Sequence, residues 1–268
     1  MMLLWHAAAL LSGSSVGLLG VYAVGLRMPF LGIGMAHAAM AGAIIGHVSG
    51  LPPTLFALAF ALAAGAGMAW LATTHARTDL GTMTSILLSF TMGCAFLAMG
   101  FNKGEMSPVL TMMWGSMLFV GTQDVIVMAG LALALFAFLA FCSRSMDALL
   151  FSRAIARVCG LPERKLLMVF MVLAGLLITV NLQIVGGLLM YSLLTNPAAA
   201  AFELGGSMRA VRWAALGFGI ASTLGGFWFS YLCDLPTGAC IVLVSTLLYC
   251  GAVVLARRRA KPGQMGSV

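Results

Sequence analysis

The sequence predicts an all-α integral membrane protein, a polytopic helix bundle of about 8 to 10 spans. The composition is the first reason: of the 268 residues, 62% are hydrophobic and 8% are charged, and the mean hydropathy is +1.08. A soluble domain has about 25% charged residues, so this chain lacks the polar surface to face water. The second reason is a series of long apolar stretches separated by short polar or Pro/Gly breaks. The third is the absence of the strand alternation that an outer-membrane barrel needs.

The N-terminal part contains four apolar stretches, and each predicts one span. The first runs from about Leu3 to Leu26. Because this start lacks a basic segment, we interpret it as a span and not as a cleavable signal peptide. The next three run from about Phe30 to Ser49, from Thr54 to Thr73 and from Met83 to Phe101.

The remaining apolar stretches differ in length. Val109 to Val120 is short for a span at about 1.5 Å per residue, so it is either re-entrant or a short crossing. Full-length or nearly full-length apolar stretches follow at about Val125 to Phe141, Leu166 to Val180, Ile184 to Ala201, Val211 to Leu232 and Thr237 to Ala256. No linker or low-complexity tract is visible, so residues 1–268 are expected to form a single transmembrane domain.

Basic residues are concentrated in two segments. Arg144, Arg153, Arg157, Arg164 and Lys165 lie in the loop of residues 143–165, and an Arg-rich tail follows residue 256. Cytoplasmic loops of membrane proteins concentrate Lys and Arg, so topology explains the net charge of +7 better than a nucleic-acid partner does. We therefore expect the loop and the C-terminus to be cytoplasmic. The side of the N-terminus stays open, because it depends on whether residues 109–120 cross.

The six cysteines are scattered, and none forms a C-x-x-C pair. Most lie in apolar runs, where a free Cys behaves as a small hydrophobic side chain. We interpret them as reduced and structural.

His37 is the ionisable residue that lies deepest in a predicted span. An ionisable side chain inside a membrane is energetically expensive and indicates a functional site by default. Imidazole also suits zinc and other transition metals as a ligand. The competing interpretation is a neutral His that bonds a backbone carbonyl of a neighbouring helix, and the residues alone leave both open.

Three further residues are weaker candidates for a metal path. Met40 follows His37 by three residues on the same helix face, and its thioether favours softer metals, although most of the 20 Met must be core residues. His47 lies near the end of the same span. Asp234 is expected on the external side, where it either receives a cation or caps the following helix. No cluster of several His has the spacing of a closed structural zinc site.

The sequence carries no nucleotide-binding or hydrolase motif. It contains no G-x-x-x-x-G-K-[ST] stretch, no Ser/His/Asp order and no H-E-x-x-H signature. The chain is therefore not expected to be an enzyme, and any ATPase activity would reside in a separate subunit.

Five stretches occur in the order of one known family pattern. They are Phe30-Leu31-Gly32-Ile33 with His37-Ala38; Trp114-Gly115-Ser116 with Asp124; the loop residues Phe151, Ala156 and Gly160; Val185-Gly186-Gly187-Leu188-Leu189 through Leu193-Leu194 to Pro197-Ala198-Ala199; and Asp234-Leu235-Pro236-Thr237-Gly238-Ala239. Spread over residues 27 to 250, they together resemble the ABC-3 permeases, the membrane subunits of zinc, manganese and iron importers.

The chain departs from that family pattern at two places. The family usually has an Asp four residues before the His, and here this position is Ile33. The family's coupling segment usually carries Asp and Glu where this chain has Ser152 and Ala154. A His without the neighbouring carboxylate shifts the preference from a hard ion towards a borderline one, so zinc is expected ahead of manganese or iron.

The resemblance implies the permease subunit of an ATP-driven ABC importer in the bacterial cytoplasmic membrane. Two copies of the chain would pair with two ATPase subunits on the cytoplasmic side and would receive metal from an extracytoplasmic binding protein. The divalent metal is the cargo, and no tightly bound cofactor is expected. His37, Met40, His47 and Asp234 would lie on the translocation path.

The resemblance also assigns a coupling role to the basic loop. ATP binding would close the ATPase subunits, and the loop would transmit that motion to the spans. The residues expected to carry it are Phe151, Arg153, Ala156, Arg157 and Gly160.

Three alternative functions stay open on the sequence alone. Asn196-Pro197-Ala198 loosely resembles a motif of iron-chelate and cobalamin permeases, and the missing Asp also fits such a cargo. An ion-coupled secondary transporter would not need a loop that faces an ATPase. An intramembrane hydrolase would need at least two paired catalytic groups within spans, and only His37 is deep.

Overall fold

The computed structural model describes residues 1–268 except 75–78, 102–119, 188–189 and 260–268, and all regular structure in the described residues is helical. The helices are α1 (Met2–Gly25), α2 (Leu31–Val48), α3 (Pro53–Thr74), α4 (Leu80–Phe101), α6 (Thr122–Phe151), α7 (Arg153–Val158), α8 (Glu163–Val185), α9 (Met190–Leu204), α10 (Met208–Cys233) and α11 (Thr237–Arg259). Eight of them are long and apolar enough to cross a membrane, and the other two are α7 and α9. The predicted all-α membrane bundle is confirmed.

Helix ends follow from local backbone chemistry. Ser207 and Ser152 each accept a hydrogen bond from a backbone N–H three residues later and so cap α10 and α7. Gly186 ends α8 with φ of +89°, a backbone conformation that residues with a Cβ rarely adopt. α9 then begins at Met190 and contains Pro197, which cannot donate a backbone hydrogen bond.

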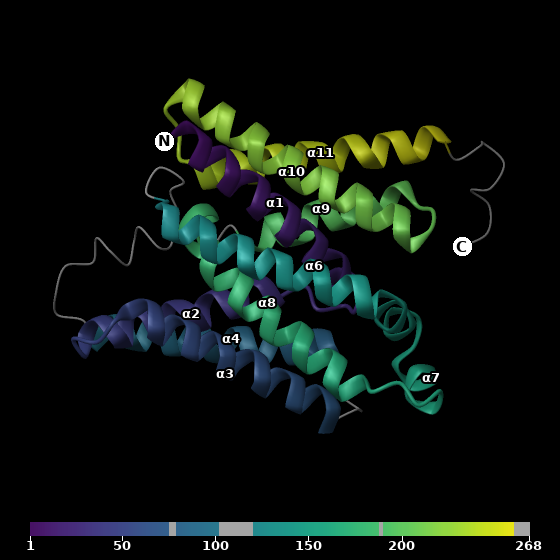
Figure 1. The fold of residues 1–268 in the computed structure, drawn as a ribbon, viewed down its shortest axis with the longest axis horizontal. Coiled ribbons are helices and arrows are strands. Elements are labelled where there is room, and N and C mark those ends of the chain that lie inside the picture. Colours follow the sequence, from purple (N-terminus) through teal and green to yellow (C-terminus); the bar gives the residue numbers. More distant parts are fainter. Residues whose placement is uncertain (75–78, 102–119, 188–189, 260–268) are drawn as a thin grey trace.

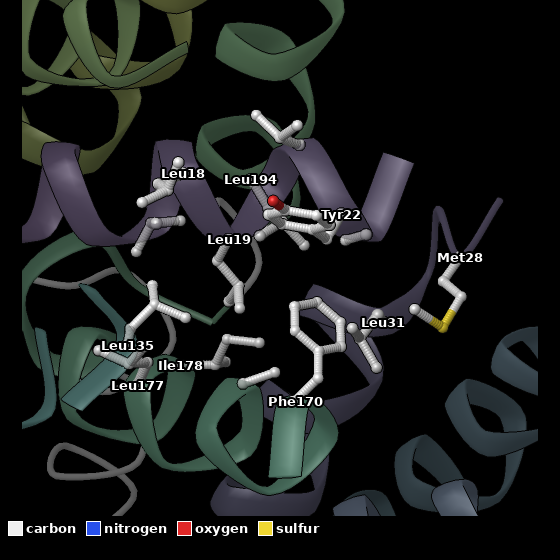
Figure 2. Close-up of a cluster of buried hydrophobic side chains, with 14 of the residues drawn as sticks. Leu18, Leu19, Tyr22, Met28, Leu31, Leu135, Phe170, Leu177, Ile178 and Leu194 are labelled. Atoms are coloured by element: carbon white, nitrogen blue, oxygen red, sulfur yellow. The ribbon is translucent and has the colours of Figure 1, made fainter. Parts of the chain in front are cut away.

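The helices form two groups that are joined by α6 and α8 (Figure 1). The first group contains α1, α9, α10 and α11, and the second contains α2, α3 and α4. The core lies where α1 meets α8. Figure 2 shows Leu19 and Tyr22 of α1 facing Ile178 and Phe170 of α8, and the rings of Tyr22 and Phe170 meet edge to face with centroids 6.1 Å apart.

The two ends of the bundle can be told apart by their contacts. At one end Trp5 of α1 lies against Phe227 near the end of α10, with ring centroids 6.2 Å apart. At the other end Gly25 of α1 lies against Leu150 of α6 and Phe202 of α9. The N-terminus therefore lies at the end opposite α7, as Figure 1 shows. This answers, relative to the basic loop, the question that the sequence left open.

Two predicted segment boundaries are wrong. The span expected at Val125 to Phe141 is part of the longer α6, so the first residues of the expected loop 143–165 are helical. A helix of 30 residues is about 45 Å long and exceeds the ~30 Å hydrocarbon core, so its polar last turns project beyond the membrane. Ile184 belongs to α8 and not to the next helix, since the chain turns only at Gly186. The stretch Val109 to Val120 lies almost wholly outside the described residues.

Candidate metal path and coupling helix

His37 lies in the second turn of α2 and is only 2% exposed. Its ring Nδ1 lies 2.9 Å from the carbonyl oxygen of Ile33, one turn earlier on the same helix. Since a carbonyl only accepts hydrogen bonds, Nδ1 carries the proton and a neutral ring keeps the lone pair on Nε2. Metal-binding His residues are commonly held in this way, with one ring N–H on a carbonyl and the other nitrogen available. The neighbouring-helix carbonyl that the sequence suggested is not the partner of Nδ1.

The two other candidates on α2 lie in different surroundings. Met40 is buried and packs in a small apolar cluster with Ala41 and Ile44 of α2 and with Ala95 and Ala98 of α4. This placement is that of a core residue between two helices. His47 lies in the last turn of α2 and is exposed, at the end of the bundle away from α7.

Asp234 follows the last residue of α10 and is exposed. It adopts the left-handed conformation, with φ of 52° and ψ of 41°, which Asp tolerates better than most residues. The prediction that Asp234 caps the following helix is wrong, because it closes the preceding helix and α11 begins only at Thr237. Its carboxylate stays at the end of the bundle that carries the N-terminus.

The four path candidates do not form one metal cage within a single chain. Across the part of the chain that the structure describes, no group of three or more His, Cys, Asp or Glu side chains is arranged to hold a metal ion. His37 is thus a single buried ligand candidate in the α2–α4 group, whereas Asp234 belongs to the α10–α11 turn of the other group.

The five residues expected to couple an ATPase all lie on or beside α7. Phe151 ends α6 and is 85% exposed, and Ala156 is buried at the inner side of α7. Gly160 follows α7 with φ of +76°, which lets the chain reverse towards α8. Arg153 and Arg157 point inward to a shared carboxylate, that of Glu163.

The outward face of α7 is apolar. Ile155 is 54% exposed and Val158 is 89% exposed, and Phe151, at the end of α6, is exposed as well. Exposed apolar side chains outside the spans indicate a protein contact. The sequence reasoning missed Ile155 and Val158, although the i, i+3 spacing on one helix face could have indicated them.

Two acidic residues with structural partners were also missed. Glu163 begins α8 and Asp147 lies near the end of α6. Glu163 pairs with both arginines of α7, and Asp147 pairs with Arg212 of α10. An acidic residue just after Pro162 is a common sign of a helix start, but no local sequence pattern indicates its partners.

The sequence pattern described as the ABC 3 transport family matches residues 1–256. The chain belongs to this family. Its members are the membrane permease subunits of ABC transporters, and the match covers α2 with His37, the loop with α7 and the α10–α11 turn.

Named relatives and a solved structure agree with this assignment. The chain is 26% identical to the manganese transport system membrane protein MntC of Listeria innocua, over 91% of this chain and 86% of that protein. It is 24% identical to the high-affinity zinc uptake system membrane protein ZnuB of Haemophilus influenzae, over 90% of this chain and 94% of that protein. The fold is similar to PsaBC from Streptococcus pneumoniae in complex with Fab, with a TM-score of 0.79 and 21% identity over 93% of this chain and 89% of that one.

Proposed function

We propose that this ABC 3 transport family member is the permease subunit of an ATP-driven importer of a divalent metal ion, and that it transports zinc in preference to manganese or iron. The observation that carries this proposal is the exposed apolar surface at α7, a short helix outside the spans. It is formed by Ile155 and Val158 of α7 and by Phe151 at the end of α6. Because the sequence contains no nucleotide-binding motif, a separate ATPase subunit would dock on this face.

The charge distribution supports the orientation of that arrangement. All Lys and Arg of the described ranges lie towards the end of the bundle that carries α7, from Arg27 after α1 to the Arg-rich end of α11. By the positive-inside rule this end is cytoplasmic, in the bacterial cytoplasmic membrane. The C-terminus then faces the cytoplasm, and the N-terminus and Asp234 face outward, towards an extracytoplasmic metal-binding protein. As in the family resemblance, two copies of the chain would form the complete permease.

His37 supports a metal ion as the cargo. The hydrogen bond to Ile33 holds the ring so that Nε2 is the free ligand atom of a neutral imidazole. In this conformation the ring is almost fully buried, so an ion reaches it only after helices around α2 have moved. A site with one strong ligand binds weakly enough to release the ion again, which suits transport.

The residue at position 33 supports zinc over manganese. Ile33 offers the ring a backbone carbonyl and no carboxylate, so the site lacks the hard oxygen ligand that favours manganese. Imidazole is a preferred ligand of zinc. Met40 adds no argument for a softer metal, because it packs in the apolar cluster with α4.

Metal uptake by proteoliposomes that contain the permease with its ATPase subunit tests this proposal. His37→Ala is expected to lower ATP-dependent zinc uptake by at least about tenfold. This corresponds to a loss of ~1.4 kcal/mol or more of binding free energy. His6→Ala is the matched control, since His6 also has its Nδ1 on a carbonyl oxygen one turn earlier on its own helix, that of Met2 at 2.8 Å, and lies outside the proposed path. Normal uptake of zinc, manganese and iron by His37→Ala would contradict the role of His37.

A second variant tests the choice of cargo. Ile33→Asp places a carboxylate one helical turn before His37, on the same face. We expect the ratio of manganese to zinc uptake to rise by about tenfold, because the added oxygen ligand favours the harder ion. An unchanged ratio would show that position 33 does not select the metal, and uptake of an iron chelate instead of free ions would contradict the metal cargo.

A further inference from the structure

Two buried or half-buried carboxylates hold the chain on either side of α7. Glu163 lies after α7, at the start of α8, and Asp147 lies before it, four residues from the end of α6. Each carboxylate binds side chains from a different part of the bundle, so the pair decides how α7 is attached to the spans.

Glu163 attaches α7 to α8 and α3. Its side chain is 6% exposed, and its Oε1 accepts hydrogen bonds at 2.6 Å from Arg153. Its Oε2 accepts hydrogen bonds from Arg157 at 2.8 and 2.9 Å. The guanidinium of Arg153 also donates to the carbonyl oxygen of Ala72 at 2.6 Å, in the last turn of α3. The carboxylate thus joins both arginines of α7 to α8, and Arg153 extends this attachment to α3.

Asp147 attaches the end of α6 to α10 and α1. Both carboxylate oxygens of Asp147 lie 2.8 Å from Nη1 of Arg212 on α10. The hydroxyl of Tyr22 on α1 donates to the same carboxylate at 3.2 Å and accepts from Arg212 at 3.1 Å. Since only Ser152 separates α6 from α7, a displacement of α7 acts directly on this cluster.

We propose that Glu163 and Asp147 are positioning residues that transmit a displacement of α7 to the two helix groups. Glu163 holds Arg153, and Arg153 passes the motion to α3, which packs against α2 and so against the helix of His37. Asp147 passes it to α1 and α10 of the other group. This inference rests on the proposed function, in which an ATPase subunit moves α7.

The chemistry of the two clusters explains why they transmit motion well. The carboxylate of Glu163 is 6% exposed and is strongly destabilised if it loses its cationic partners, so the partners move together instead of separating. Asp147 is 25% exposed and is held by its hydrogen bonds to Arg212 and Tyr22. Arg153 and Arg157 each bind one oxygen of Glu163 through two guanidinium nitrogens, which keeps the direction of the motion as well as its size. Each cluster therefore links the chain next to α7 rigidly to the spans.

The test uses the complex of permease and ATPase subunit in liposomes, with zinc as the transported ion. ATP hydrolysis and zinc uptake are measured separately for Glu163→Gln and Asp147→Asn. We expect hydrolysis to continue and the zinc transported per ATP hydrolysed to fall roughly 2- to 30-fold in each variant. A loss of assembly alone would instead lower both rates together.

Glu203→Gln is the matched control, because Glu203 is an exposed acid at the same end of the bundle and takes part in none of the ion pairs among the described residues. If this control, Glu163→Gln and Asp147→Asn all transport as much zinc per ATP as the wild type, the inference is overturned and the proposed function still stands. No ATP-dependent uptake by the wild type and the control overturns the proposed function instead.

A charge-swapped variant keeps the inference testable where the neutral variants do not assemble. Asp147→Arg combined with Arg212→Asp restores the ion pair between α6 and α10 with its charges reversed. Recovery of zinc uptake per ATP, relative to Asp147→Arg alone, supports the positioning role. A double variant that assembles but stays uncoupled overturns it.

Discussion

The α1–α10 interface and the α3–α4 groove are both built from helices rich in glycine and alanine, yet they pack in opposite ways. At the α1–α10 interface a Cβ added to Gly17 would lie 2.7 Å from the carbonyl oxygen of Ala215, and one added to Gly13 would lie 2.5 Å from that of Gly219. Between α3 and α4, both of which pack on α2, an apolar cavity of 590 Å³ remains open.

A glycine of the groove shows the difference most directly. A Cβ added to Gly67 of α3, which lines the groove, would meet no other group within 4 Å. Small residues permit close helix contact in membranes, but they do not by themselves produce it. The tight interface is a fixed joint, whereas α2, which carries His37, forms part of the open groove through Ala38 and Ala41. This division fits the proposed transport, in which the helices around His37 move.

The largest expected effect is at the tight interface. Gly219→Ala places a Cβ against the backbone carbonyl of Gly13, which cannot move without shifting α1. We expect a loss of about 1–3 kcal/mol or more in the free energy of unfolding, measured by SDS unfolding of the purified permease. Gly217→Ala on the same helix is the control, because a Cβ there meets nothing within 4 Å. Equal stability of the two variants would show that α1 and α10 are not in fixed contact.

A smaller effect is expected from two threonines that make equivalent contacts in the two regions. Thr223 of α10 donates to the carbonyl of Ala9 on α1 at 2.7 Å, and Thr91 of α4 donates to that of Gly34 on α2 at 3.1 Å. Replacing either with Val should cost about 0.6 kcal/mol, and up to ~1.7 kcal/mol. In the same unfolding measurement, we expect the loss of unfolding free energy to be larger for Thr223→Val than for Thr91→Val, since the tight interface cannot relax. A larger cost for Thr91→Val would reverse the comparison.

The smallest effect is expected in the groove. Gly67→Leu adds a side chain that the 590 Å³ cavity can hold without moving a neighbouring helix. We expect the free energy of unfolding to stay within about 1 kcal/mol of the wild type, because the gain in helix propensity offsets any cost of repacking. A marked loss of stability in this variant would mean that α3 and α4 close together in the membrane.

The positions of most helices could be predicted from the sequence, but not the full lengths of α6 and α8. Hydropathy placed the long spans to within a few residues, with the exceptions of the ends of α6 and α8. α6 continues through charged residues that hydropathy assigns to a loop, whereas α8 begins among such residues and continues past Val180 through the polar Asn181. Asp147 lies in the part of α6 that extends beyond the apolar stretch, and Arg164 lies in the first turn of α8, just before its apolar stretch.

The candidate site was recognised only in part. His37 could be singled out because an ionisable residue in an apolar span is rare, and the structure adds the ring orientation set by Ile33. The arginines of α7 could be found in the basic loop, but their partner Glu163 could not. Which acid faces which base depends on how α7 folds back on α8, and no local pattern records that.

What the sequence by itself determined is the membrane bundle, the intramembrane His37 and the position of the basic loop, since these depend on composition and local order. The tertiary structure decided which end of the bundle holds the N-terminus, which glycines are in contact and how α7 is attached. Arg212, for example, meets Tyr22, which precedes it by 190 residues, at the carboxylate of Asp147. The physical reason is that hydropathy is a property of each segment, whereas ion pairs and close helix contacts depend on the register between segments far apart in the chain.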